Sequence, residues 1–120
     1  MEQGKDYVVE MINLNRVEVT GLQFHDYAMN AQELVVGTEL QLIREAFNEF
    51  DRKAIAVYHG SNKIGFVARE ENNMLHVLLD RGVPLYGYVT EHDTERGITK
   101  GNRRLMMAVY MPYTFLLEQE

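Results

Sequence analysis

The sequence predicts a mainly β (α+β) fold, a small antiparallel six-stranded barrel of the SH3-like or OB-like kind with one main helix. Six short segments carry the alternating or β-branched patterns that are typical of strands. A glycine-containing turn at residues 60–62 predicts a hairpin between two of them. Residues 69–81 have the broad apolar face of a helix. With 120 residues, the chain forms one domain: an N-terminal arm or short helix (1–15), a barrel (16–111) and a C-terminal tail (112–120).

The first part of the chain offers one strand and one long connection. Residues 1–15 have no strong period, which leaves an arm or a short helix open. Residues 16–22 alternate, with Val17 and Val19 on one side, and predict the first strand. Residues 23–37 form a long connection with one helical turn near 28–34. Long ordered loops on a compact scaffold are where binding groups tend to lie.

Residues 44–57 follow the second strand, at 39–44, and have two interpretations. Ala46, Phe47 and Phe50 recur at three- and four-residue spacing, which favours an amphipathic helix. Asn48 and Asp51 instead favour an ordered polar loop, because both side chains can hydrogen-bond to nearby backbone. In that case a strand covers 54–59. Periodicity alone leaves both interpretations open.

The remaining elements have clearer signals. Residues 54–59 and 63–67 are joined by the 60–62 turn, where glycine and asparagine accept a positive φ. The helix at 69–81 has Glu70 and Glu71 in its first turn, and Gly82 stands at its C-terminal end. Two more strands, 85–91 and 105–111, are joined by a polar loop at 92–102. The apolar residues of the tail could dock on the core or on a second copy.

Composition excludes several classes of protein. The chain has no cysteine, so disulfides, a thiol nucleophile and a cysteine-based zinc site are excluded. No apolar run is long enough to span a membrane, and the acidic, polar N-terminus does not resemble a secretory signal, so we expect a cytoplasmic protein without a membrane partner. The net charge of −6 disfavours extensive contact with phosphates and leaves room only for a local basic patch.

Catalytic and metal sites have little support. The only serine, Ser61, lies in the hairpin turn without a nucleophile-elbow pattern around it. Residues 91–95 combine His92 with carboxylates, but consecutive ligands in a turn rarely converge on one ion, and we expect a solvated loop. We predict no enzyme activity, no metal and no cofactor.

A motif within residues 44–57 identifies a family. The pattern R-E-x-x-N-x-F-D-x-x-A-I-x-V, with K-I-G-F-V at 63–67 and G-L-Q-F at 21–24, resembles the HIRAN domain over roughly residues 17–110. That module occurs in helicase-like remodelling ATPases and as a stand-alone bacterial protein. The resemblance implies a small barrel in which residues 44–57 form a loop and then a strand, so the helical interpretation is set aside.

The resemblance also implies a function. Members of the family bind the 3′ end of single-stranded DNA, which implies a non-enzymatic module of DNA repair or replication-fork processing. The chemistry is coherent, because rings stack on bases and a carboxylate accepts a hydrogen bond from a hydroxyl. The implied nucleic-acid-binding residues are Gln23, Phe24, Phe50, Asp51, Phe66 and Arg69. Candidate phosphate contacts are Arg52, Lys53, Lys100 and Arg103.

Asp51 matches the family aspartate, whereas several other positions depart from the pattern. Phe24 and Phe50 stand where tyrosines are usual, and Gln23 where an arginine occurs. The alternative function is a protein-interaction module that uses the barrel groove, a sheet edge or the apolar tail.

Overall fold

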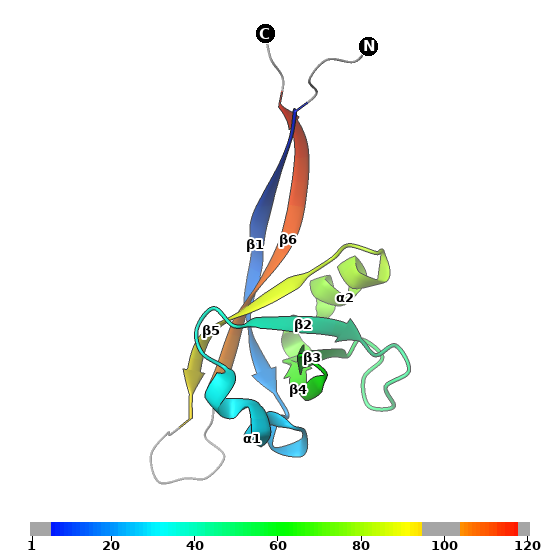
Figure 1. Cartoon of the computed structure of the whole chain (residues 1–120). Helices are drawn as coiled ribbons and strands as arrows, with labels where there is room; N and C mark the ends of the chain where they lie inside the picture. The colour runs from blue at the N-terminus through cyan, green and yellow to red at the C-terminus, as the bar shows by residue number, and fades with distance from the viewer. Residues whose placement is uncertain (1–5, 95–103, 118–120) are drawn as a thin grey trace.

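The computed structural model describes residues 6–94 and 104–117, whose six strands close into an antiparallel barrel (Figure 1). Around the barrel the strand order is β1-β4-β3-β2-β5-β6. The bounds are β1 Asp6–Thr20, β2 Glu39–Arg44, β3 Ile55–His59, β4 Asn62–Val67, β5 Tyr86–Asp93 and β6 Arg104–Leu117. The predicted fold class is confirmed, and so is the interpretation of residues 44–57 as a loop followed by a strand.

The barrel interior is filled by aliphatic side chains that alternate along the strands. The fully buried ones include Val17, Val19, Leu40, Ile55, Val57, Ile64, Val89, Leu105 and Met107. Helix α1 (Tyr27–Asn30) adds the buried ring of Tyr27, and helix α2 (Asn73–Asp80) adds Leu75. Each buried aliphatic side chain contributes roughly 1.5–3 kcal/mol, so this core is the main source of stability. No described helix is long and apolar enough to cross a membrane.

The barrel closes at a short seam between β1 and β4. Only two residue pairs form it, Val19 with Val67 and Thr20 with Phe66. Gly65 permits this approach, because a Cβ at that position would collide with the carbonyl oxygen of Thr20. The seam therefore requires glycine at position 65, and it places Thr20 beside Phe66 at one end of the barrel.

The predicted helix at 69–81 is correct in its body and wrong at its start. Residues Arg69–Glu71 form a separate 3-10 turn, and α2 begins at Asn73. Asn72, between them, is buried and donates its side-chain amide to Asp51. Gly82 ends the helix with φ 81°, as its position predicts.

The helical turn expected near 28–34 is present as α1 and a 3-10 turn at Ala31–Glu33. The first strand ends at Thr20, because Leu22–Phe24 forms another 3-10 turn. Strand β5 runs through Asp93, so the expected start of a loop at residue 92 is wrong.

The two ends of the chain depart most from prediction. Strands β1 and β6 pair from Asp6 with Leu117 to Val19 with Leu105, with a register shift between Asn13 and Asn15. The alternative of a short helix is therefore wrong for residues 6–15, and residues 112–117 belong to a strand. Residues 6–13 of β1 and 110–117 of β6, which we call the arm, project from the barrel (Figure 1). The molecule measures 65 × 30 × 24 Å, and its radius of gyration is 17.1 Å, against about 14 Å for a compact domain of this length.

Candidate functional site

The loop of residues 45–54 is irregular but held by hydrogen bonds. The side-chain oxygen of Asn48 accepts the backbone N–H groups of Phe50 (2.8 Å) and Asp51 (3.0 Å). At the base of the loop, the N–H of Glu45 donates to the carbonyl of Ala54 at 3.0 Å. Because one asparagine oxygen satisfies two successive N–H groups, the turn that carries Phe50 and Asp51 is fixed by the sequence itself.

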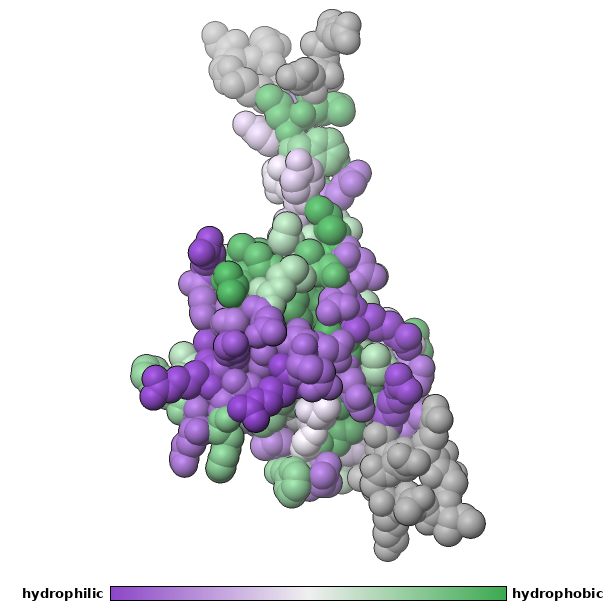
Figure 2. All heavy atoms as spheres, turned by 180° about the vertical axis from the view of Figure 1, so that it is seen from behind, coloured by the Kyte–Doolittle hydropathy of each residue, from purple (hydrophilic) through white to green (hydrophobic). Residues whose placement is uncertain are grey.

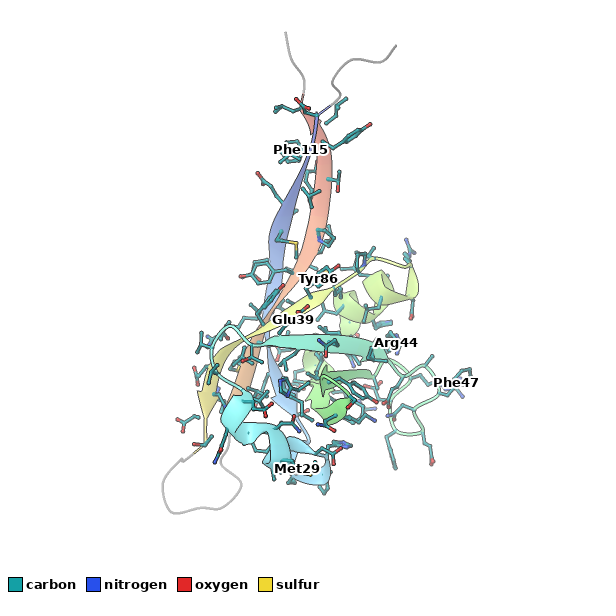
Figure 3. All side chains as sticks on the ribbon, in the orientation of Figure 1. Met29, Glu39, Arg44, Phe47, Tyr86 and Phe115 are labelled. Atoms are coloured by element: carbon teal, nitrogen blue, oxygen red, sulfur yellow. The ribbon has the colours of Figure 1, made fainter. Side chains whose placement is uncertain are left out.

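Arg44 fixes this loop to the rest of the barrel. Its guanidinium donates to the carbonyls of Ala54 (2.8 Å) and Arg52 (2.9 Å), and to the carboxylate of Asp80 in α2 at 2.8 and 3.2 Å. The side chain is only 15% exposed, so these bonds are partly shielded from water. Arg44, labelled in Figure 3 at the end of β2, therefore has a structural role.

One side of the loop faces an open pocket of about 220 Å³, which we call the loop pocket. Its lining comes from β1, the loop, β4 and the turn before α2: Thr20, Asn48, Phe50, Asp51, Ala54, Phe66, Val67 and Arg69. The ring of Phe50 is 83% exposed. Phe47, on the same loop, is fully exposed and points away from the barrel (Figure 3), and it does not line the pocket.

Asp51 is an ionised acceptor beside this pocket. Its Oδ1 accepts the N–H of Lys53 at 2.9 Å, and its Oδ2 accepts the amide of Asn72 at 3.0 Å. Partial burial acts to raise the pKa of Asp51, but these hydrogen bonds and the charge of Arg69 together hold the pKa below its ordinary value. A carboxylate offers about four lone-pair sites, so Asp51 retains acceptor capacity after both bonds.

Arg69 brings positive charge to the rim of the loop pocket. Its Nη2 donates to the carbonyl of Phe50 at 3.0 Å, and its Nε lies 3.7 Å from Asp51 Oδ2. The side chain is 74% exposed, which leaves the remaining N–H groups accessible to an anionic ligand.

Phe66 is held by two residues that sequence reasoning missed. Lys63 Nζ lies 4.6 Å from the centre of the Phe66 ring, and the ring of His25 meets it edge-on with centroids 5.3 Å apart. Lys63 also forms an ion pair with Glu45 at 2.5 Å. Burial, and then the charge of Lys63, lower the pKa of His25. Lys63 belongs to the quoted K-I-G-F-V motif, so the motif itself was the signal that could have identified it.

The other predicted contacts lie outside the loop pocket. Gln23 and Phe24 belong to the 3-10 turn at Leu22–Phe24; Phe24 is 76% exposed, and neither residue lines the pocket. Arg52 is exposed, and Lys53 donates to the side chain of Asn73 at 3.2 Å. Lys100 and Arg103 lie outside the described residues.

His92 does not belong to a solvated loop, which corrects the expectation for this segment. It lies in β5, where Nε2 is 2.6 Å from the hydroxyl of Tyr27 and Nδ1 is 2.9 Å from the carbonyl of Leu34. These bonds tie the 27–34 connection to the sheet. Within residues 6–94 and 104–117, no three His, Asp or Glu side chains gather as metal ligands would.

A small closed barrel with an open pocket of aromatic rings, a carboxylate and a guanidinium defines a binding domain. The profile of the HIRAN domain matches residues 12–114. The chain therefore belongs to the HIRAN domain family, as the motif predicted, and this family is known for nucleic-acid binding and is generally non-catalytic.

Solved structures agree with this assignment. A crystal structure of a protein from Lactobacillus plantarum is similar with a TM-score of 0.77 and 29% identity, covering 88% of this chain and 98% of that one. The crystal structure of the HIRAN domain of human HLTF shares the fold, with a TM-score of 0.63 and 20% identity over 92% of this chain and 82% of that one. No curated protein matches the sequence.

Proposed function

We propose that the loop pocket binds the 3′ end of single-stranded DNA without catalysis, and that the protein serves DNA repair or replication-fork processing, where such ends arise. One observation carries the proposal: Phe50, Phe66, Asp51 and Arg69 surround a single open pocket of about 220 Å³. Pockets for drug-sized ligands run from roughly 300 to 1,000 Å³. The smaller volume limits the occupant to about one nucleotide at the end of a strand.

Each group has a role in this proposal. The exposed ring of Phe50 offers a stacking face for a base, and Phe66 is the second ring that lines the pocket. Stacking contributes roughly 1–3 kcal/mol per base and does not read sequence. The two hydrogen bonds that Asp51 already receives keep its carboxylate ionised. The ionised carboxylate accepts a hydrogen bond from the free 3′-hydroxyl and repels the negative charge of a 3′-phosphate.

Phosphate contacts are few, so we expect weak binding. Arg69 is the cation that lines the pocket. The positive charge of Lys63 is offset by its ion pair with Glu45. Phe24 and Gln23, which the resemblance also implicates, would engage the DNA only beyond the terminal nucleotide, since they do not line the pocket. With one or two phosphates contacted, the logarithm of affinity should fall with the logarithm of salt with a slope of about −1.

Fluorescence anisotropy with labelled oligonucleotides tests the mechanism. The wild type should bind a 3′-hydroxyl strand at least about tenfold more tightly than the same strand with a 3′-phosphate, a preference worth about 1.4 kcal/mol. Asp51→Asn should abolish the preference, and Glu49→Gln, an exposed carboxylate of the same loop, should retain it. The ratio of the affinities for the two strands is a suitable readout, because partial unfolding of a variant lowers its apparent affinity for the 3′-hydroxyl strand and for the 3′-phosphate strand by the same factor.

A second pair of variants tests the stacking face. Phe50→Ala should weaken binding about 5- to 100-fold, whereas Phe47→Ala, which removes an exposed ring of the same loop outside the pocket, should have a small effect. Equal binding of both oligonucleotides by the wild type, or binding indifferent to salt, would contradict the proposal; the second result would favour a peptide ligand.

A further inference from the structure

The arm has no core of its own. Residues 6–13 of β1 pair only with β6 in the described structure, and β5 reaches β6 only as far as Tyr110. An isolated two-stranded ribbon is marginally stable in water, and a third strand or a covered apolar face is needed for independent stability. Yet the arm exposes Tyr7 (63%), Val9 (61%) and Met11 (45%), and apolar residues line it above the body of the molecule in Figure 2.

The two faces of the arm differ in charge. Directly paired residues of an antiparallel ladder point to the same side, so Tyr7 pairs with Leu116, Val9 with Thr114 and Met11 with Pro112 on one face. This face, which we call the uncharged face, contains no Asp, Glu, Lys, Arg or His; its only ionisable groups are the phenols of Tyr7 and, at the base, Tyr110. The opposite face contains Asp6, paired with Leu117, and Glu10, paired with Tyr113.

We propose that the arms of two copies of this chain pack together through their uncharged faces, related by a twofold axis. A twofold contact sets each patch against its own copy, so the patch must be self-complementary. The uncharged face meets this condition even though each chain has a net charge of −6. Glu10 disfavours the same contact on the opposite face, so association stops at a dimer and does not continue into a fibre.

The size of the face sets the strength of the dimer. Eight residue pairs at about 3.4 Å each give a ribbon about 27 Å long and about 10 Å wide, so two copies bury roughly 600 Å². Stable interfaces bury about 1,200–2,000 Å². Tyr86, which pairs with Tyr110 at the base of the same face, extends the contact slightly (Figure 3). We therefore expect a reversible dimer, populated at hundreds of micromolar and dissociated at roughly low micromolar concentration.

Dimerisation through the arm leaves the loop pocket open. Thr20, at the other end of β1, lines that pocket, whereas Tyr7 and Val9 lie at the end that associates. Two copies joined in this way would keep both pockets distant from the contact.

Sedimentation equilibrium of the full chain between about 5 and 500 µM tests the proposal. We expect a monomer–dimer equilibrium whose dissociation constant rises at least about tenfold in Val9→Lys, because dimerisation would bury the added charge. Tyr113→Lys places the same charge on the opposite face of the arm, where Tyr113 is 48% exposed, and should change the constant less than about twofold. Circular dichroism of both variants verifies folding.

Cysteine cross-linking provides an independent measurement, since the chain has no native cysteine. Met11→Cys should form disulfide-linked dimers on oxidation, and Tyr113→Cys should not. A monomer at every concentration, a dimer that both lysine variants disturb equally, or cross-linking through position 113 alone would overturn the proposal.

Discussion

The loop of residues 45–54 and the arm are opposites in regularity and in what stabilises them. The loop contains no strand or helix, yet the backbone N–H groups of Phe50, Asp51, Lys53 and Ala54 all have acceptors. The arm is a regular antiparallel ladder, yet its side chains face water on both sides. Regular secondary structure is therefore no guide to local stability in this protein.

The difference follows from where each region is attached. The loop is fixed by partly buried groups of the barrel, above all Arg44 and Asn72. The arm is attached only at its base and gains little from burial. Proteins open locally with free energies that range from near zero up to the global value, and we place the arm near the low end and the loop near the high end. Four substitutions or conditions test this ranking.

Arg44→Ala should have the largest effect, because it removes the bonds that hold the loop to α2. Two carbonyls lose a charged donor, and hydrogen bonds to charged groups contribute roughly 1.5–3 kcal/mol each. We expect the free energy of unfolding to fall by about 3 kcal/mol, measured by urea denaturation. Arg81→Ala, an exposed arginine just beyond the same helix, is the charge-matched control and should change it by less than about 0.5 kcal/mol. Similar losses in the two variants would show that the loop is not held by Arg44.

Asn48→Ala should have a smaller effect on stability and a clear effect on the site. The substitution leaves two loop N–H groups to water, at a cost of about 1–2 kcal/mol. Because those groups belong to Phe50 and Asp51, DNA-end binding should weaken further than stability does. Asn73→Ala, whose side chain bonds only to the exposed Lys53 among the described contacts, is the matched control. Retained end binding in Asn48→Ala would argue against a preformed pocket.

How much of the fold could be predicted depends on one-sided burial. Strands β2 and β5 alternate because one face packs on the core, and β3 and β4 are marked by buried β-branched residues and the turn between them. The positions of all four were predicted to within about two residues. The arm residues show no period, because apolar side chains lie on both of its faces and most of them are exposed: Tyr7, Val8, Val9, Met11 and Ile12. Alternation of apolar and polar residues arises when one face of a strand is buried. A strand without a buried face has no such alternation and cannot be recognised from its sequence pattern.

The site was predictable only in part, and for a different reason. The residues alone left Phe50 and Asp51 open to a helix, and the family motif decided for a loop. Phe66 and Arg69 then share the pocket as the motif implied, but Phe24 does not, because the 3-10 turn that carries it breaks the strand at Thr20. The contact of Lys63 with Glu45 joins two segments across the barrel end, and local sequence contains no information on such a distance.

Acid should weaken the loop more than the arm. Hydrogen bonds hold the pKa of Asp51 and of Glu45 below their ordinary values of 3.8 and 4.5, although burial alone would raise both. Ionised carboxylates with lowered pKa values in the native state stabilise it fully above the ordinary values, and this contribution is lost as the pH falls through the lowered ones. Thermal unfolding followed from pH 7 downward should therefore show a decline that begins near pH 4 to 4.5. Asp51→Asn should make that decline shallower, and parallel profiles would contradict the role given to Asp51.

The smallest effect should come from the arm itself. Val57→Ala in β3 removes a fully buried side chain and should cost about 2 kcal/mol, whereas Val9→Ala, 61% exposed in the arm, should change barrel stability by less than about 0.5 kcal/mol. Amide hydrogen exchange gives the same contrast without mutation, because arm amides should exchange far faster than those of β3 at low micromolar concentration. Raising the concentration should slow exchange in the arm and leave β3 unchanged, since association covers only the arm. Slow, concentration-independent exchange at residues 7–12 would mean that the ribbon is stable alone, and the contrast between the two regions would then fail.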